Sequence, residues 1–493
     1  MAVNSLGAIW SCCSPDFGSE TIFERFSQIE PVLLIAVDGY WYNRKSYSIL
    51  STSKHLKSQI PSIRETILIP YLDKDAIAKD THRLQESDEI SEIHFESVPF
   101  SHPIWVLYSS GTTGKPKAIT HSHGGVLLEH LKYLSLHNDV KVGENFFWFS
   151  TTGWMMWNFL QASLLVGATP VLYDGSPANP DLHILWKLAE QLPIHHFGTS
   201  APYLTTLMKH GLIPGKEHNL SNLRTVGSTG SPLPPEIFHW VYEAIGEEIW
   251  LCSMSGGTDV CTAFVGGCIE KPVYEGRIQG RSLGCALSAY TDEGLPIKNE
   301  LGEMVIDQPM PSMPINFWND PGDERYLASY FQYFPGKWRH GDWIKIFEDG
   351  SLVIQGRSDA TLNRKGIRIG TAEIYNAMDQ LDEVKDCLII NIEKPNGNDV
   401  MPLFVSLPSL QVLSEELKAK INDFLKSKCS PRHVPDTIIQ VSDIPYTLSG
   451  KKMEVPVKRL FTKHISSKPM DYGAMRNPEA MKEFAALSED IDI

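Results

Sequence analysis

The sequence lacks the features of a secreted, membrane or nucleic-acid-binding protein. Its longest early apolar run, residues 31–37, is far shorter than the about 20 residues that span a bilayer. The first residues, MAVNSLGAIWSCC, contain neither the charged nor the full apolar segment of a secretory signal. Basic residues are also in deficit, with 44 Lys+Arg against 59 Asp+Glu. This balance argues against a nucleic-acid backbone or an anionic membrane as the main partner, and it predicts a soluble acidic protein.

Cysteine occurs eight times in the 493 residues, but the sequence contains no C-x-x-C pair. Scattered cysteines in a chain of this length indicate buried or incidental thiols in a reducing compartment, and they argue against a zinc site. Two histidine pairs, His121 with His123 and His195 with His196, have no other metal-ligating residues beside them. We therefore expect both pairs to be structural.

Internal repeats and low-complexity segments are also missing, and the chain instead alternates short apolar runs, amphipathic stretches and turns. This alternation predicts the α/β class. Hydrophobic residues make up 42% and charged residues 21%, which is enough apolar material for a large core. At about 150 residues per domain, the length suggests roughly three units.

Two predicted strands run into Gly-rich loops. The first is residues 103–108 (PIWVLY), followed by a segment with leucines at helical spacing, at Leu127, Leu128, Leu131 and Leu134. Pro234 and Pro235 open a later helix, whose expected shared face is Phe238, Val241, Tyr242 and Ile245. Residues 248–253 then predict a strand that ends in SGGTD. Open α/β sheets bind ligands at the carboxyl ends of their strands, so we expect a site at these loops.

The pattern changes near Gly356. From there we predict a helix at 372–381, strands at 387–392 and 402–407, a helix at 414–426 and a strand at 437–441. These form a compact α+β unit of single-domain size. The predicted domains are 1–358, 359–465 and a polar, loosely held tail at 466–493.

The loop SSGTTGKPK is the strongest local signal for a ligand. Its hydroxyl, glycine and lysine groups suit the binding of oxyanions. The spacing of its glycines, and Pro116 after Lys115, exclude a Walker A loop. A flexible surface turn is the alternative. Its candidate residues are Ser109, Ser110, Gly111, Thr112, Thr113, Gly114, Lys115 and Lys117.

Further candidates follow along the chain, each with a plain alternative. Thr258 and Asp259 in SMSGGTD suit a phosphate with Mg²⁺, because hard cations take oxygen ligands, or they form an ordinary turn. The segment Gly230, Ser231 and Pro232 fits an aromatic ring or a stiff linker. Asp342 fits a ribose diol or a turn cap. Three basic residues could equally be exposed surface charges: Arg357, Arg368 and Lys451.

In order and spacing, these loops resemble the adenylate-forming superfamily of acyl-CoA synthetases, luciferases and peptide-synthetase adenylation domains. YSSGTTGKPK resembles its phosphate loop, GSP its adenine-stacking segment and SGGTD its Tyr-Gly-x-Thr-Glu motif. HGDW resembles its ribose-binding motif, GRSDATLNRKGIRIG its hinge and following loop, and YTLSGKK its catalytic-lysine motif. Within the superfamily, SPDFG, DGYWYN, TTGWMMWN and YDGSP resemble the acetoacetyl-CoA synthetases over essentially the whole chain.

Two departures accompany this resemblance. Asp259 stands where most of the superfamily has Glu, although acetoacetyl-CoA synthetases share the Asp. The sequence also begins where the family is already inside its large N-terminal domain. The implied fold is α/β, with a large N-terminal domain of stacked α/β subdomains, N-terminally incomplete, and a small mobile α+β C-terminal domain.

The resemblance implies a cytosolic ligase of lipid metabolism that uses ATP, Mg²⁺ and CoA. Acetoacetate would attack ATP to give acetoacetyl-AMP and diphosphate, and CoA would then displace AMP. Two alternatives remain: a broader short- or medium-chain acyl-CoA synthetase, and an impaired nucleotide-binding protein. The sequence does not indicate the oligomeric state.

The resemblance also implies roles for individual residues. In the first half-reaction Lys451 would neutralise charge, Thr258 would donate to the α-phosphate and Asp259 would hold Mg²⁺. Asp359 matches the hinge, with Lys365 and Gly366 moving to the thioester side. Nucleotide contacts are implied for Ser109–Lys117, Gly230, Ser231, Pro232, Ser255, Gly256, Gly257, Asp342, Arg357 and Arg368.

Acyl size is the last implication of the resemblance. Acetyl-CoA synthetases have a Trp at the position of Gly256, so its loss would open room for acetoacetate, and we expect Gly256→Trp to favour acetate. Trp154, Met155 and Trp157 are candidates for the apolar wall, or simply core residues.

Overall fold

The structure is a computed structural model that forms two compact units. It describes residues 1–493 except 79–80, 85–91, 93, 110–115, 359–361, 365–366, 370, 393–399, 410, 449, 463–471 and 491–493. The first unit comprises Met1–Thr229, Pro235–Cys285 and Gln308–Gln332, and the second comprises Gly230–Pro234, Ala286–Asp307 and Tyr333–Ile493. The sequence-based boundary between 358 and 359 stays a prediction.

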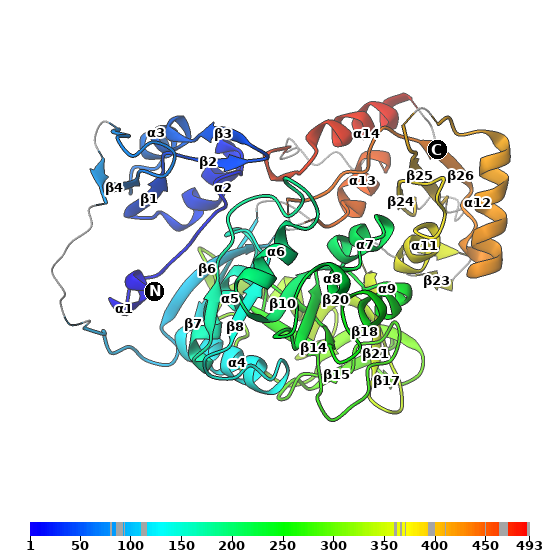
Figure 1. Cartoon of the computed structure of the whole chain (residues 1–493), viewed down its shortest axis with the longest axis horizontal. Helices are drawn as coiled ribbons and strands as arrows, with labels where there is room; N and C mark the ends of the chain where they lie inside the picture. The colour runs from blue at the N-terminus through cyan, green and yellow to red at the C-terminus, as the bar shows by residue number, and fades with distance from the viewer. Residues whose placement is uncertain are drawn as a thin grey trace. The chain divides into compact units, whose positions relative to one another are not determined.

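A five-stranded parallel sheet forms the centre of the first unit, in the order β12-β11-β10-β8-β9. Its strands are β8 (Asn145–Trp148), β9 (Thr169–Val171), β10 (Ile194–Ser200), β11 (Thr225–Thr229) and β12 (Trp250–Ser253). Helices α5 (Met156–Ala162), α6 (Ile184–Gln191) and α7 (Ala201–Lys209) pack against its strands (Figure 1). The buried runs in β10 and β11 are typical of parallel strands that are covered on both faces.

Large aromatic side chains fill the core next to this sheet. Phe159 of α5 meets Phe146 and Trp148 of β8 edge to face, with ring centres 5.9 and 5.8 Å apart. A Cβ atom on Gly198 would lie 2.1 Å from the ring of Trp148, and one on Gly227 would lie 2.7 Å from it. The two glycines of β10 and β11 therefore make the space in which this indole lies.

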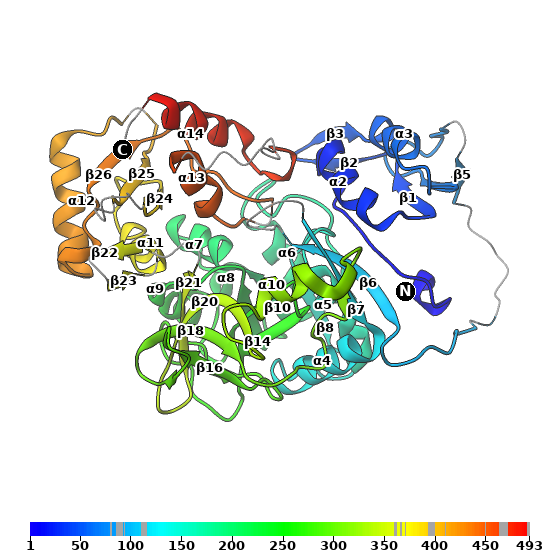
Figure 2. The same ribbon diagram turned by 180° about the vertical axis from the view of Figure 1, so that it is seen from behind.

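Smaller sheets complete the first unit. One sheet has the order β19-β7-β6 and consists of β6 (Pro103–Ser109), β7 (Lys117–Ser122) and β19 (Asn316–Phe317). A second sheet has the order β13-β14-β15 and consists of β13 (Ser255–Gly257), β14 (Thr262–Gly266) and β15 (Gly280–Arg281). Near the N-terminus lie the sheet β1-β4-β5 and the hairpin β2-β3, formed by β1 (Leu33–Val37), β2 (Gly39–Tyr42), β3 (Lys45–Ser48), β4 (Glu65–Ile69) and β5 (His82–Arg83). Helix α10 (Glu324–Tyr330), which is labelled in Figure 2, packs against β19. The other helical segments are α1 (Ala2–Ser5), α2 (Ser19–Ile29), α3 (Leu50–Gln59), η1 (Ser163–Val166), α8 (Pro214–Glu217) and η3 (Pro321–Asp323).

Four predicted elements of the first unit are confirmed, one of them with a different buried face. Residues 103–108 form β6, 248–253 overlap β12, and the Pro-Pro segment opens α9 (Pro235–Trp240) with the π-helical turn η2 (Val241–Ile245). The leucine-spaced helix is α4 (His123–Leu136), but Leu127, Leu128 and Leu131 are exposed. Helix α4 instead buries Val126, Glu129, His130, Tyr133 and Leu134. Polar residues on the buried face concealed it from the hydrophobic pattern, since Lys132 pairs with Glu129 and His130 hydrogen-bonds the Cys261 carbonyl.

The second unit contains an antiparallel sheet in the order β17-β16-β18-β20-β21. Its strands are β16 (Leu287–Tyr290), β17 (Pro296–Ile297), β18 (Leu301–Ile306), β20 (Trp338–Ile346) and β21 (Leu352–Arg357). Towards the C-terminus, β22 (Leu362–Arg364) pairs with β23 (Ile367–Ile369), and a further sheet consists of β24 (Asp386–Ile389), β25 (Pro402–Ser406) and β26 (Thr437–Gln440). The helical segments of this part are α11 (Thr371–Met378), α12 (Glu415–Lys428), η5 (Pro431–His433), α13 (Glu454–Phe461), η6 (Tyr472–Ala474) and α14 (Pro478–Asp490). All five elements predicted after Gly356 are confirmed to within a few residues.

The polar C-terminal tail is the point where the prediction was wrong. Helix α14 buries Met481 and Phe484 completely, against Phe404 and Ile390 among others. The two apolar residues are one turn apart, so they share a face despite the charged residues around them. Packing of that face, rather than overall polarity, holds the segment Pro478–Asp490.

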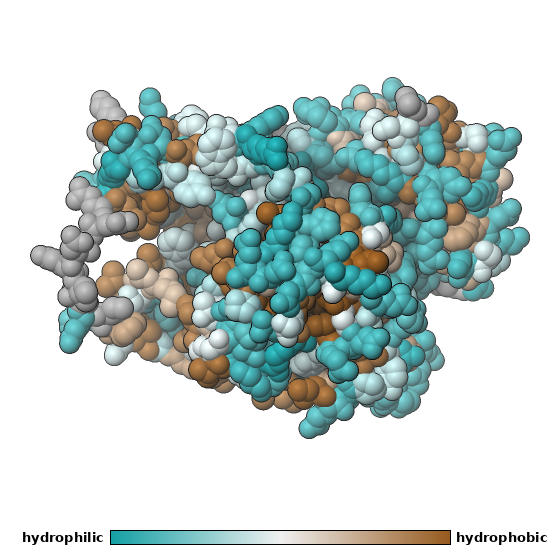
Figure 3. Space-filling model, in the orientation of Figure 1, coloured by the Kyte–Doolittle hydropathy of each residue, from teal (hydrophilic) through white to brown (hydrophobic). Residues whose placement is uncertain are grey.

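The described residues contain no helix long and apolar enough to cross a membrane. Hydrophilic residues cover most of the face in Figure 3, with hydrophobic residues in small groups among them. All eight cysteines are free thiols, as the sequence predicted.

Candidate active site

Asp259 lies just beyond the carboxyl end of β12, where the sequence predicted a ligand site. After β12 the chain passes through Met254, whose carbonyl accepts a hydrogen bond of 2.9 Å from the Thr229 hydroxyl of β11. It then forms β13 and reaches Thr258 and Asp259. The parallel sheet thus positions this pair at the edge where open α/β sheets bind ligands.

Lys117 and Tyr330 surround the carboxylate of Asp259. The Tyr330 hydroxyl donates a short hydrogen bond to Asp259 Oδ1, and Lys117 Nζ lies 3.9 Å from the same oxygen. Lys117 Nζ also lies 4.8 Å from the ring centre of Tyr330 and 5.6 Å from that of Phe317, which favours the cation. The side chains of Asp259 and Lys117 are 16% and 29% exposed. This Asp259 cluster (Lys117, Asp259, Phe317 and Tyr330) therefore keeps a loosely paired charge within reach of solvent.

Two buried histidines hold the backbone around Asp259. His121 Nε2 lies 3.0 Å from the Asp259 carbonyl and His130 Nε2 lies 2.6 Å from the Cys261 carbonyl. Burial lowers the pKa of both imidazoles to about 4, although the backbone bonds act to raise it. Both rings are consequently neutral near pH 7 and donate to these carbonyls, in agreement with the structural role predicted for His121.

Thr258 lines a small cavity of about 50 Å³. Trp154 and Met155 contribute to its wall, and Trp157 packs against the neighbouring hydrophobic core. That this cavity holds the acyl group stays a prediction. The sequence motifs did not point to the remaining lining residues, which include Cys12, Cys13, Phe17, Arg25, Tyr108 and Asn158. The Cys12 thiol donates to the Thr152 carbonyl at 3.1 Å, and burial raises the pKa of Cys12 to about 11. The thiol is thus protonated and serves as a neutral wall.

Gly256 has a packing role that the sequence did not reveal. A Cβ atom on Gly256 would lie 2.0 Å from the Thr262 carbonyl oxygen and 2.6 Å from the Ala263 Cα. These are backbone atoms of the paired strand β14, which cannot move aside as a flexible side chain can. Gly256 is not among the residues that line the cavity. A Trp at this position would therefore disrupt the β13–β14 pair, rather than simply fill an acyl pocket.

Much of the predicted phosphate loop lies outside the described residues: Ser110, Gly111, Thr112, Thr113, Gly114 and Lys115. Its two ends are described, Ser109 at the end of β6 and Lys117 at the start of β7, and they face each other in the antiparallel pair. The loop therefore begins and ends within one strand pair. Lys117 places one end of it in the Asp259 cluster.

In the second unit, Asp342 and Arg357 come together as predicted. They are register partners in β20 and β21, with Arg357 Nη1 3.6 Å from Asp342 Oδ2. Arg357 also donates to the His340 carbonyl at 3.2 Å. The side chain of Arg357 is 44% exposed and that of Asp342 is 15% exposed. Arg357 is held over the Asp342 carboxylate and still reaches solvent.

A neighbouring ion pair was missed by the sequence reading. Arg339 Nη2 lies 3.0 Å from Glu303 Oε2, and the Ser358 hydroxyl donates to Glu303 Oε1 at 3.0 Å. Burial raises the pKa of Glu303 even though Arg339 opposes the shift. The partners are 36 residues apart in the sequence, so only the β18–β20 pairing reveals them.

Lys451 lies in an open turn, and its backbone N–H donates to the Thr447 hydroxyl at 3.0 Å. Its neighbour Lys452 is largely buried, with 19% of its side chain exposed, and donates to Asp386 Oδ1 at 2.7 Å. An isolated bridge pairs Tyr446 with Lys452. Lys451 is thus exposed, whereas the ammonium of Lys452 is bound to Asp386.

The remaining predicted residues are placed only by their elements. Gly230 has φ +95°, a conformation that suits glycine, and it follows β11 directly with Ser231 and Pro232 after it. Ser255, Gly256 and Gly257 form β13. Asp359, Lys365, Gly366 and the side chain of Arg368 lie outside the described part of the chain.

Comparison with known proteins agrees with this geometry. A family described as AMP-binding enzyme matches residues 1–313. The acetoacetyl-coenzyme A synthetase of Rhizobium meliloti is 46% identical over 99% of this chain and 75% of its own length. The acetoacetyl-CoA synthetase of Gallus gallus is 40% identical, with the same coverage of both chains.

Solved structures give the same result. The acetoacetyl-CoA synthetase from Streptomyces lividans superimposes with a TM-score of 0.93 at 45% identity, over 99% of this chain and 75% of that one. An anthranilate CoA ligase, at 20% identity and a TM-score of 0.71, shares the fold. The α/β architecture expected from the sequence is confirmed. The chain belongs to the acetoacetyl-CoA synthetases, within the AMP-binding enzymes.

Proposed function

We propose that this chain activates acetoacetate with ATP and transfers the acyl group to CoA. In the first half-reaction a carboxylate oxygen of acetoacetate attacks the α-phosphorus of ATP, and diphosphate leaves to give acetoacetyl-AMP. In the second, the CoA sulfur attacks the acyl carbonyl carbon and AMP leaves. Family membership supports the AMP-forming ligase reaction. We further propose that the reaction takes place in the cytosol.

The observation that carries this proposal is the position of the small cavity next to the Asp259 cluster. Thr258 lines the cavity and is followed directly by Asp259. An acyl group in the cavity would thus lie beside the residues proposed for the triphosphate. Thr258 would donate to the α-phosphate and Lys117 would supply positive charge, because both half-reactions change charge at this phosphate.

Asp259 fits the role of a magnesium ligand. Its carboxylate supplies oxygen, the ligand atom that Mg²⁺ prefers, and it is partly exposed. When bound, the ion would neutralise phosphate charge. The described contacts of Tyr330 and Lys117 both use Oδ1, and they orient the carboxylate while His121 holds the backbone behind it.

In the second unit, we propose that Asp342 binds the ribose diol and that Arg357 lies beside it. The 3.6 Å approach of the guanidinium to Asp342 orients the carboxylate that would accept the two hydroxyl protons. The Gly230–Pro232 segment would lie against adenine, and Lys451 would neutralise charge in the first half-reaction. The loop 110–115, Gly366 and Arg368 keep the phosphate and CoA roles proposed from the resemblance.

A broader acyl-CoA synthetase is the second candidate, but the acetoacetyl-CoA synthetases that the chain resembles favour acetoacetate. Diphosphate release with ATP–Mg²⁺ and CoA should therefore be largest for acetoacetate in a panel with acetate, butyrate and hexanoate. Equal kcat/KM for hexanoate and acetoacetate would contradict the proposed substrate. Binding of ATP without product formation would indicate the impaired nucleotide-binding alternative.

A further inference from the structure

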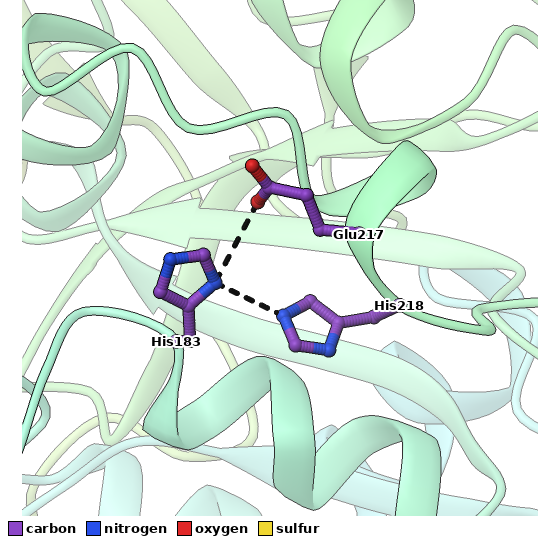
Figure 4. Close-up of side chains that lie close together, drawn as sticks. All are labelled: His183, Glu217 and His218. Atoms are coloured by element: carbon purple, nitrogen blue, oxygen red, sulfur yellow. Dashed lines mark hydrogen bonds and ion pairs between the residues drawn. The ribbon is translucent and has the colours of Figure 1, made fainter.

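Three side chains of types that can bind a metal meet at the ends of two helices in the first unit (Figure 4). His183 is the residue before α6, Glu217 ends α8, and His218 follows it. One ligand atom from each lies within 4.8 Å of the other two. His183 Nδ1 is 3.1 Å from His218 Nε2 and 3.5 Å from Glu217 Oε2. The segments that form the site are distant in the sequence. Neither histidine belongs to the pairs His121 with His123 and His195 with His196.

A fourth residue orients one of the rings. Glu190 Oε2 lies 3.4 Å from His218 Nδ1, on the opposite side of the imidazole from His183. The other Glu190 oxygen accepts the Asn219 N–H at 3.1 Å, which fixes the carboxylate. A carboxylate beside Nδ1 keeps the proton there and leaves the Nε2 lone pair directed at the cluster. The side chain of His218 is only 6% exposed, so its ring is held in this orientation.

We propose that His183, Glu217 and His218 bind one Zn²⁺ ion, with water in the fourth position. Two imidazole nitrogens and one carboxylate oxygen form a known zinc ligand set. With bonds of about 2.0–2.1 Å, ligand atoms around a tetrahedral zinc lie roughly 3.3 Å apart. The observed separations of 3.1 and 3.5 Å bracket this value. Imidazole ligands also select against Mg²⁺ and Ca²⁺, which prefer oxygen.

The site differs in position and chemistry from the magnesium site proposed at Asp259. It shares no residue with the Asp259 cluster, and it joins the start of α6 to the end of α8. A bound ion would cross-link these two segments, which precede and follow β10 and α7 in the chain. Zinc would therefore stabilise the folded chain by an amount that grows with the logarithm of its concentration, and it would take no part in acyl transfer.

The test uses the whole chain without a polyhistidine tag, stripped with a chelator and then dialysed. Calorimetric titration with ZnCl₂ should give one bound equivalent, and MgCl₂ or CaCl₂ at the same concentration should give none. The melting temperature should rise with zinc concentration and fall again on addition of EDTA. Co²⁺ in place of Zn²⁺ should show the intense visible absorption of a tetrahedral ion.

Variants identify the ligands. His183→Asn and His218→Ala should each remove the bound equivalent, and Glu190→Gln should weaken binding by about 10-fold or more without changing the stoichiometry. His239→Ala is the matched control, because His239 pairs with Glu275 at 3.0 Å on an exposed surface and, among the described residues, belongs to no group of three possible metal ligands. It should bind zinc like the parent chain.

Several results would overturn the proposal. The first is that His183→Asn still binds one equivalent of zinc. The second is that the chain binds several weak equivalents of zinc that are lost equally in the control variant, which would mean an adventitious ion only. The third is that the parent chain binds no zinc. If His218→Ala fails to fold by circular dichroism, His183→Asn decides, since His183 is 34% exposed and its replacement leaves His218 packed.

Discussion

The Lys117–Asp259 pair of the first unit and the Lys452–Asp386 pair of the second are built differently. In the Asp259 cluster the Lys117 ammonium lies 3.9 Å from the carboxylate, and both side chains are partly exposed. In the second unit Lys452 lies 2.7 Å from Asp386, which also accepts the Tyr446 hydroxyl at 2.7 Å. Lys452 further donates to the Cys387 carbonyl and lies 4.1 Å from the Tyr375 ring centre.

The difference lies in how many protein groups hold each pair. Lys452 and Asp386 are satisfied by protein groups, so removal of one leaves the other, a largely buried charge, without compensation. In the Asp259 cluster the two charges lie farther apart, and we propose that they accept a phosphate or a cation. We therefore interpret the Asp259 cluster as functional and the Lys452–Asp386 pair as structural.

Breaking the tight pair should have the largest effect. Lys452→Met leaves the largely buried Asp386 without its cation, which should cost about 3–5 kcal/mol of unfolding free energy. Urea denaturation followed by circular dichroism measures this loss. The double variant Lys452→Met with Asp386→Leu should recover part of it, because both charges are then absent. A stability within 1 kcal/mol of the parent for Lys452→Met would show that the pair is not structural.

The neighbouring lysine should behave in the opposite way. Lys451→Ala should lower acetoacetate-dependent ATP–diphosphate exchange by about 10²- to 10³-fold, because a positioned positive charge is lost at the reacting phosphate. Its melting temperature should stay that of the parent. Thioester formation from supplied acetoacetyl-AMP should continue, since the role proposed for Lys451 belongs to the first half-reaction. Exchange at the parent rate would remove Lys451 from the mechanism.

Acid should lower the stability of the first unit, and alkali should lower that of the second. Burial lowers the pKa of His121 and His130 to about 4, against 6.5 when exposed. Below pH 6.5 the unfolded chain binds more protons, so stability falls as the pH drops from 6.5 toward 4, by up to about 3 kcal/mol for each ring. Denaturation at pH 7 and pH 5 measures the loss, which should be smaller in His130→Asn. An equal loss in that variant would contradict the assignment.

Alkali should act on the second unit. Burial alone would lower the pKa of Lys452, but Cys387, Asp386 and Tyr446 nearby raise it above the ordinary value. A raised pKa gives stability that is complete below about pH 10 and is lost as the pH rises beyond it. The parent should therefore lose stability above pH 10 more steeply than Lys452→Met with Asp386→Leu. Parallel curves would mean that Lys452 does not titrate with unfolding.

The two tyrosines offer the finest comparison. Tyr330→Phe removes the hydroxyl that orients Asp259 and should lower kcat/KM about 10- to 100-fold, with a higher Mg²⁺ requirement. Tyr446→Phe removes a hydroxyl from the buried Asp386 and should lower stability by about 1–3 kcal/mol while leaving kcat/KM unchanged. Paired kinetic and denaturation measurements decide between them. If Tyr330→Phe lowered stability and Tyr446→Phe lowered kcat/KM, the functional and structural assignments of the two clusters would have to be exchanged.

Sequence patterns predicted the strands and helices well where local signals were strong. Ser414 illustrates this, because its hydroxyl caps α12 by accepting the Leu417 N–H, and the helix begins where predicted. The buried face of α4 was not predictable, since it carries Glu129 and His130. Helix α14 was underestimated because its buried residues are few and lie one turn apart.

For the site, sequence motifs pointed to Thr258, Asp259, Asp342 and Lys451, whose roles stay predictions. They did not point to Tyr330 or Arg339, because each contacts a partner far away in the sequence. A tyrosine or an arginine of this kind has no local signature. Its role becomes visible only when the fold brings the partner within hydrogen-bonding distance.

The close approach of Gly256 to β14 also bears on how the acyl preference of such enzymes can change. With the Thr262 carbonyl 2.0 Å from the place of a Cβ atom, even alanine requires the two strands to separate. A path from this sequence to one with a large residue at position 256 must alter the strand pairing before, or together with, the side chain. The residue at position 256 is therefore constrained by the backbone geometry of the strand pair. A single substitution there should seldom change the acyl specificity without disrupting that pair.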